Sequence, residues 1–215
     1  MILLAVETSG IPGSIALSRD QELLEEKTLE STGRRHAQTL VAEIDALLKR
    51  HQILPPEIDV VAVSTGPGSF TGLRVGVTFA KTFAWLNDAA LVAVETSAVI
   101  ASQAPEDLQI VRVIMDALRG ECFASVYRIN SDGHWIPEEP IAIASLESLP
   151  TDIALTGAGI EKLPEAQCPL YHRTDPATWT PRAASVAGVG WKLAHSGQFS
   201  DPAQLEPTYV RRSYA

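Results

Sequence analysis

The sequence predicts an α/β protein built from two related halves, each with a mixed sheet of its own. The first observation is that short apolar strand-like runs are interleaved with segments of helical periodicity. The second is that the same order of elements begins again near residue 109, although sequence identity between the halves is slight. A length of 215 residues suits one large domain or two small ones, and a hydrophobic content of 46% is ordinary for a globular core.

The first half is expected to span residues 1–104. Its expected elements, in order, are strands over 1–6, 14–18 and 22–29, a helix from Arg35, a strand over 60–63, a helix over 70–86, a strand over 90–94 and a helix opening at 95–98. The helix from Arg35 is predicted because its apolar residues fall on one face, and the pair Pro55-Pro56 ends the segment. That face consists of Ala37, Leu40, Val41, Ile44, Leu47 and Leu48.

The second half is expected to span residues 105–215. Its expected elements are strands over 109–115, 122–128 and 141–144, a short helix over 145–149, a strand over 153–156 and a helix over 181–196 with proline near its start. The last helix could pack back on the first half, an alternative that the sequence leaves open.

Charge and cysteine content restrict the class of protein. A formal net charge of -9 disfavours an independent nucleic-acid binder, which needs a basic surface to neutralise phosphates. Two cysteines without a C-x-x-C motif suit a reducing cytoplasm. The start, MILLAVETSG, is interpreted as a first strand, and no window approaches the ~18 apolar residues of a membrane span. We therefore expect a cytoplasmic chain that does not bind membranes.

The glycine-rich loop STGPGSFTGLRVG, residues 64–76, lies between an expected strand and an expected helix. It matches neither the P-loop motif nor the dinucleotide-binding motif G-x-G-x-x-G. Backbone N–H groups at residues 69–71 could still favour an anion. Alternatively, Ser69 or Thr71 caps the helix and the loop serves packing, and we favour this second interpretation.

The helix after this loop has a wider apolar face than one sheet needs. Its apolar and small residues cover an arc of about 200°, whereas packing on a sheet uses ~100°. The opposite arc holds Arg74, Thr78, Lys81, Thr82 and Trp85. The excess indicates a second partner, either a helix of the same domain or another subunit. The candidate interface residues are Leu40, Ile44, Leu47, Gly72, Gly76, Phe79, Ala80 and Phe83.

Residues able to carry chemistry are few. The five histidines include no i, i+4 pair, so no metal ligand and no catalytic residue is assigned. Glu7 and Asp116 end the first strands of the two halves, where carboxylates could anchor a magnesium-nucleotide, or could simply cap the adjoining turns. Further weak candidates for nucleotide or phosphate contact are Thr8, Gly68, Ser69 and Arg119.

Five segments resemble the TsaB (YeaZ) family of bacterial tRNA threonylcarbamoyladenosine biosynthesis proteins. They are ILLAVETS, RRHAQTLVAEIDALL, VVAVSTGPGSFTGLRVGVTFAK, MDALRGECFASVY and PTYVRRSYA, and the resemblance runs from end to end. It implies the actin-like fold of sugar kinases and heat-shock ATPases, with two ribonuclease-H-like subdomains. It further implies a non-catalytic subunit of the complex that transfers a threonylcarbamoyl group to the adenosine beside the anticodon of tRNAs reading codons that start with A.

The resemblance also implies the partners. They are the catalytic paralogue TsaD, bound through helices, and the ATPase TsaE. When TsaD is absent we expect a homodimer, because an exposed apolar helix face would pair with itself. Transfer RNA is expected to be reached only through the complex, to which Arg34, Arg35, Arg211 and Arg212 could contribute. The chain is expected to have no cofactor of its own, with magnesium and ATP or ADP acting at the level of the complex.

Two positions depart from the patterns that the resemblance implies, and a third agrees with a non-catalytic role. Glu7 stands where aspartate is common in the fold, and Leu118 stands where the family typically has arginine. His36 is followed four residues later by Leu40, where the paralogue has a second histidine. Two alternatives stay open, namely a stand-alone ATPase or kinase of the actin-like fold and a self-associating structural protein.

Overall fold

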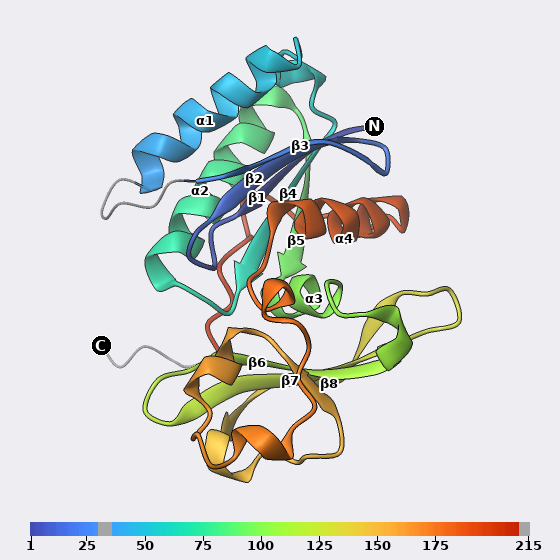
Figure 1. Ribbon diagram of the computed structural model, residues 1–215. Helices are drawn as coiled ribbons and strands as arrows, with labels where there is room; N and C mark the ends of the chain where they lie inside the picture. Colours follow the sequence, from blue (N-terminus) through green and yellow to red (C-terminus); the bar gives the residue numbers. More distant parts are fainter. Residues whose placement is uncertain (30–35, 211–215) are drawn as a thin grey trace. The chain divides into compact units, whose positions relative to one another are not determined.

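A computed structural model of the protein describes residues 1–29 and 36–210, shown in Figure 1. Contacts divide the chain into two compact units. Of the described residues, the first comprises those of Met1–Thr96 and Pro181–Pro207, and the second comprises Ser97–Thr180 and 208–210. The basic residues at 34, 35, 211 and 212 lie outside the described residues.

The first unit is built on a five-stranded mixed sheet with the order β3-β2-β1-β4-β5. The strands are β1 (Ile2–Glu7), β2 (Ser14–Arg19), β3 (Glu22–Thr28), β4 (Val60–Gly66) and β5 (Ala90–Glu95). The first three strands pair antiparallel, while β1–β4 and β4–β5 pair in parallel. Continuous apolar runs make β1 and β4 suitable for the centre, where both faces of a strand are covered.

Helices cover both faces of this sheet (Figure 1). On one face lie α1 (His36–Arg50) and α2 (Phe70–Asn87), whose apolar residues share a buried core with alternate residues of β1 and β2. On the other face α4 (Ala183–His195) packs against β1, β2, β4 and β5. Because α4 supplies the only large cover on that face among the described residues, it belongs with the first sheet.

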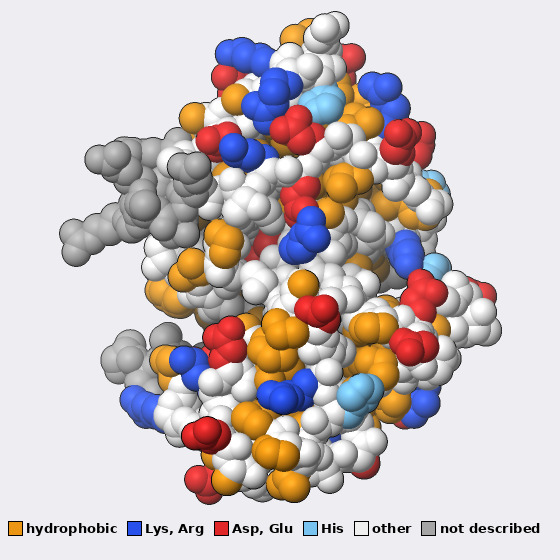
Figure 2. Space-filling model, in the orientation of Figure 1, with side chains coloured by type: hydrophobic (Ala, Val, Ile, Leu, Met, Phe, Trp, Pro, Cys, Tyr) orange, Lys and Arg blue, Asp and Glu red, His pale blue; other side chains and the backbone are white. Residues whose placement is uncertain are grey.

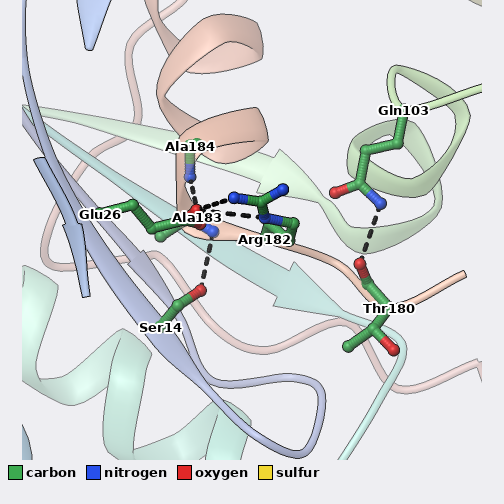
Figure 3. A network of polar contacts seen from close by, with 7 residues as sticks. All are labelled: Ser14, Glu26, Gln103, Thr180, Arg182, Ala183 and Ala184. Carbon is green, nitrogen blue, oxygen red and sulfur yellow. Dashed lines mark hydrogen bonds and ion pairs between the residues drawn. The ribbon is translucent and has the colours of Figure 1, made fainter. Parts of the chain in front are cut away.

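Two polar side chains of the sheet hold the start of α4 (Figure 3). The Ala183 N–H donates to Ser14 Oγ at 2.8 Å, and the Ala184 N–H donates to Glu26 Oε1 at 3.0 Å. Arg182 pairs with the other oxygen of Glu26 through Nε, at 3.1 Å, and through its terminal nitrogen. Side chains thus satisfy two of the N–H groups that every helix start leaves without a partner inside the helix.

The second unit has a four-stranded sheet with the order β8-β7-β6-β9. Its strands are β6 (Ile110–Asp116), β7 (Glu121–Ile129), β8 (Trp135–Ser145) and β9 (Ala154–Thr156), and the short helix α3 (Thr96–Ala101) precedes them. The β6–β7 and β7–β8 pairs are antiparallel, and β6–β9 is parallel. Within this unit Gln103 Nε2 donates to the Thr180 carbonyl at 2.9 Å (Figure 3).

The structure corrects several expected boundaries. The strand expected over 141–144 is the longer β8, and the helix expected over 145–149 is a 3-10 turn, Leu146–Ser148. Val41, expected on the apolar face of α1, is 57% exposed. The units divide after Thr96 instead of after residue 104. Residues 181–207 join the first unit, the alternative that the sequence left open, because α4 buries its apolar stripe on the first sheet. Among the described residues, no helix is both long and apolar enough to cross a membrane.

Candidate partner interface

The glycine-rich loop caps α2 and fastens it to the end of β1. Ser69 is the N-cap of the helix, and its Oγ accepts the Gly72 N–H at 3.2 Å. The Ser69 N–H donates to the Ser9 carbonyl at 2.8 Å. A Cβ at Gly68 would stand 2.6 Å from the same Ser9 oxygen, so only glycine allows the loop to approach this closely. The sequence offered Ser69 and Thr71 equally as the cap of α2, and the structure confirms Ser69.

The space beside the loop is too small for a phosphate. The cavity there has a volume of about 10 Å³, which is room for about one water. It is lined by Thr8, Gly10, Ile11, Gly13, Leu29, Ser69 and Gly72. Since the Ser69 N–H is already used by Ser9, the geometry favours capping over anion binding.

Glu7 holds the turn after β1, so the structure does not support its expected role as a magnesium or nucleotide anchor. The side chain is fully buried, and Oε1 accepts the Ser9 N–H and the Ser9 Oγ–H, both at 2.5 Å, and the Gly10 N–H at 3.0 Å. Oε2 accepts the Ser64 hydroxyl. Burial raises the pKa of the carboxyl, although these hydrogen bonds act in the opposite direction. Both carboxylate oxygens are therefore occupied by the protein itself.

The corresponding carboxylate of the second unit also caps a turn. Asp116 Oδ1 accepts the Leu118 N–H at 2.7 Å. Leu118 and Arg119 have left-handed backbones, with φ of 65° and 59°, and Gly120 follows at 76°. Asp116 and Arg119 are exposed, and so is Leu118, at 68%. The turn-capping alternative for Asp116 is the one observed.

The small-residue stripe of α2 faces its own sheet. A Cβ at Gly72 would stand 1.9 Å from the Thr8 carbonyl oxygen, and one at Gly76 would stand 2.2 Å from Thr8 Oγ1. Ala80 is completely buried on the same side. The expectation that Gly72, Gly76 and Ala80 meet a helix of another subunit is therefore wrong. Their spacing reflects the close approach of α2 to the end of β1.

The expected residues of α1 are also internal. Leu40, Ile44 and Leu47 are at most 2% exposed and belong to the core beneath α1 and α2. Phe79 and Phe83 are half-buried, with ring centroids 5.6 Å apart. Only these two aromatic residues of the expected set keep a substantial exposed surface.

The solvent-facing side of α2 carries large apolar residues that the expected set omitted. Phe70, Trp85 and Leu86 are 47%, 77% and 67% exposed. The Arg74 guanidinium lies 3.9 Å from the centroid of the Phe70 ring, a cation–π contact. Figure 2 shows hydrophobic side chains at the surface where α2 runs in Figure 1. The sequence could have indicated this solvent-facing side, because Arg74 and Trp85 belong to the arc of α2 opposite its apolar arc.

An open groove of about 460 Å³ runs between α1 and α2. We call it the α1–α2 groove, and it is lined by Leu40, Val41, Arg74, Val75, Thr78, Phe79 and Thr82. Its walls are mainly apolar, with one guanidinium at the side. Such a surface suits a partner that inserts apolar side chains.

The described residues contain no group of three or more histidine, cysteine, aspartate or glutamate side chains able to hold a metal ion. Leu40, four residues after His36, is 1% exposed within the core. The position where the paralogue has a second histidine is thus part of the packing of α1.

Comparisons with known proteins identify the family. Residues 23–201 match the family model described as TsaD, tRNA N6-adenosine threonylcarbamoyltransferase. The tRNA threonylcarbamoyladenosine biosynthesis protein TsaB of Escherichia coli is 25% identical over the whole chain and 96% of that protein. TsaB of Bacillus subtilis is 29% identical over 67% of this chain, and the match spans 63% of that protein, which is less than two thirds of its length.

Solved structures show the same fold. The structure of YeaZ from Pseudomonas aeruginosa matches with a TM-score of 0.82 and 23% identity, covering 97% of this chain and 99% of that one. A second structure, described as similar to peptidase YEAZ from the same organism, has a TM-score of 0.83 at 24% identity over 98% and 99% of the two chains. The actin-like fold with two ribonuclease-H-like units is thereby confirmed. The chain belongs to the TsaD family, and within it to the TsaB (YeaZ) group.

Proposed function

We propose that this chain is a non-catalytic subunit in tRNA threonylcarbamoyladenosine biosynthesis. Its α1–α2 groove and the exposed side of α2 bind a TsaD-type catalytic paralogue, and the resulting pair assembles with a TsaE-type ATPase. The chain has no cofactor of its own in this proposal, and magnesium with ATP or ADP acts in the complex. When the paralogue is absent, two copies of the chain pair through the same surface.

The observation that carries this proposal is the contrast between the two sides of α2. On the inner side, Glu7 and Ser69, two of the groups that could have held a nucleotide, bond to the protein itself. On the outer side, Trp85 and Leu86 are more than half exposed, and other residues of the same helix line an apolar groove. Large exposed apolar residues next to a groove are typical of a partner-binding surface.

Charge supports an indirect contact with tRNA. The chain carries a formal net charge of -9, and a protein that binds RNA by itself needs a positive surface. We therefore expect the isolated chain to bind tRNA weakly, with a TsaD-type partner supplying most of the basic surface. A gel shift of the isolated chain at physiological salt checks this, and nanomolar binding would contradict it.

Reconstitution tests the function directly. Threonylcarbamoyladenosine in tRNA is measured by nucleoside analysis after incubation with threonylcarbamoyl-adenylate and the TsaD-type and TsaE-type proteins, with and without this chain. The modified nucleoside should form only when this chain and the TsaD-type protein are both present. Product formed by this chain alone, or turnover of magnesium-ATP by it, would instead show a stand-alone enzyme.

A charge placed in the α1–α2 groove tests the proposed interface. Val41→Arg puts a guanidinium at a position that is 57% exposed, so the free chain should fold normally. A charge buried without a partner in an interface costs several kcal/mol, which predicts a loss of affinity for the TsaD-type protein of about a hundredfold or more. The matched control is Leu170→Arg in the second unit, where the native side chain is 62% exposed.

Binding is measured by titration, and folding by circular dichroism. The control should bind the partner like the unchanged chain. If Val41→Arg binds as tightly as Leu170→Arg, the groove is not the interface, whatever the outcome of the reconstitution.

A further inference from the structure

The two edge strands of the first sheet differ in how they discourage pairing with another chain. The edge strand β3 reads ELLEEKT, and its charged side chains disfavour the addition of a further strand. The opposite edge strand, β5, reads ALVAVE and is apolar up to Glu95. Short apolar segments of high β-propensity, without proline or charge, pair readily with other chains when their edge is exposed. β5 therefore needs a cover that its own side chains do not supply.

The segment that follows α4 supplies this cover. We call residues 199–205 the C-terminal strap. The Ser200 N–H donates to the Leu91 carbonyl at 2.8 Å, and Ser200 Oγ accepts the Ala93 N–H at 3.2 Å. Alternate residues of an edge strand point their backbone groups away from the sheet, and an added strand would use these groups. Ser200 thus occupies the position that the next strand of the sheet would take.

The far end of the strap is attached to α2. The Leu205 carbonyl accepts a hydrogen bond from Lys81 Nζ at 2.9 Å, and the Leu205 side chain packs against the core beneath α1 and α2. In between, the Asp201 carbonyl accepts the N–H groups of Gln204 and Leu205 at 3.1 and 2.9 Å, which closes a turn. The strap therefore runs from α4, on one face of the sheet, past the edge of β5 to α2 on the other face.

The strap is held less firmly than the strand that it covers. Phe199 is 55% exposed, and Ser200 and Leu205 are only half-buried, whereas Val92 and Val94 of β5 are fully buried. Segments with few buried apolar contacts open at a lower free energy than core strands. The strap can therefore leave β5 while β5 stays paired with β4.

We propose that the C-terminal strap is a removable cover of a strand-pairing surface, and that the occupant of the uncovered edge is β5 of a second copy. Two identical strands related by a twofold axis pair antiparallel, which joins the sheets of two copies edge to edge. A second β5 presents the same apolar run, whereas the charged side chains of β3 disfavour pairing at that edge. This association uses the sheet edge instead of the α1–α2 groove, so the proposal does not depend on the proposed function.

Leu205→Asp opens the strap by withdrawing its apolar anchor from the core. The variant is made in a Val41→Arg chain, so that any pairing through the α1–α2 groove is blocked. Sedimentation equilibrium should show a dimer at protein concentrations about tenfold or more below those needed by Val41→Arg alone, because loss of a half-buried leucine favours the open strap. The matched control is Ala203→Asp, which puts the same charge at an exposed position of the strap and should leave the association unchanged.

Ala93→Pro identifies the surface that associates. The Ala93 N–H bonds to the strap, so proline at this position removes a group that an added strand needs and leaves the β4–β5 pairing in place. Adding Ala93→Pro to Leu205→Asp should return the association to the level of Val41→Arg alone. Persistence of the dimer in this variant would overturn the proposal.

Ser200→Pro opens the strap independently of Leu205. It removes both hydrogen bonds between the strap and β5 and should also produce the dimer. Circular dichroism checks that each variant is folded, and Ser200→Pro keeps the test decisive if Leu205→Asp does not fold. A folded opening variant that associates no more strongly than Val41→Arg alone would refute the proposal.

Discussion

Replacing Gly76 with alanine should destabilise the first unit, because α2 and the end of β1 leave no room for a methyl group. The added Cβ would stand 2.2 Å from Thr8 Oγ1, where ordinary contact begins at 3.4 Å. Thr8 cannot easily move aside. It is β-branched, it is 4% exposed, and its Oγ1 donates to the Gly72 carbonyl at 2.8 Å.

The expected magnitude combines three effects. Overpacking a buried contact costs about 1–3 kcal/mol, and loss of the Thr8 hydrogen bond adds about 1 kcal/mol. Alanine in a helix interior gains about 1 kcal/mol over glycine. The net loss of unfolding free energy should be about 1–3 kcal/mol, or a Tm lowered by about 2–10 °C for a chain of this size.

Equilibrium urea unfolding, followed by circular dichroism, measures this loss. The matched control is Gly188→Ala in α4, where the new Cβ meets no atom within 4 Å, so the same change should stabilise by about 0.5–1 kcal/mol. Thr8→Ala removes the clashing oxygen, and the double variant should recover much of the loss, with a coupling energy of about 1–2 kcal/mol. A Gly76→Ala chain that is as stable as Gly188→Ala would refute the internal contact and reopen a role for Gly76 in binding.

Substitutions at three other positions make further predictions about the stability of the chain. Glu7→Gln tests the buried carboxyl: its folded pKa is raised above 4.5, so between 4.5 and that folded value the native state holds a proton that the unfolded state has released. The unfolding free energy of the unchanged chain, relative to Glu7→Gln, should therefore fall as pH rises above 4.5, and a rise measured by urea titration across pH would contradict this. Glu26→Ala removes the acceptor at the start of α4 and should cost about 1–3 kcal/mol by thermal unfolding, whereas Glu138→Ala, in an exposed ion pair, should change stability by less than about 1 kcal/mol. Equal losses would show that the start of α4 is held otherwise. In Gly190→Ala the new Cβ would stand 2.6 Å from the Ala62 Cβ, so unfolding should be easier, and Ala62→Gly should restore stability in the double variant; a failure of rescue would place the strain elsewhere.

The fold could be predicted where the residue pattern of one strand or helix determines by itself which of its faces must be buried. The apolar runs of β1 and β4 require cover on both faces, and the amphipathic pattern of α1 requires cover on one. The pattern of α4 shows only that it must bury a stripe, not on which sheet, so its return to the first unit was one alternative that the sequence could not decide. The first half of β8 was missed because Pro137 and Pro140 argue against a strand, yet β8 is an edge strand, where proline is tolerated.

The candidate site shows the same limit. Periodicity correctly identified a close contact along Gly72 and Gly76, but it could not identify the neighbour. The neighbour is Thr8, more than 60 residues earlier in the chain, and no spacing rule joins the two segments. Capping by Ser69 could be predicted because it depends on residues three apart.

In the proposed function, α2 serves both stability and binding, and the arrangement around β1 is compatible with both roles. Glu7 fixes the turn at 8–10 through Oε1 and joins it to Ser64 of β4 through Oε2, and the turn supplies the Thr8 and Ser9 groups that hold the start of α2. With its inner side held by the backbone of its own unit, α2 needs no further partner to stay folded. Its outer side can therefore carry Trp85 and Leu86 in solvent at little cost to the position of the helix, and a partner meets a surface that is already formed. Binding to a preformed surface avoids the entropy cost of ordering it, which favours association through this side of α2.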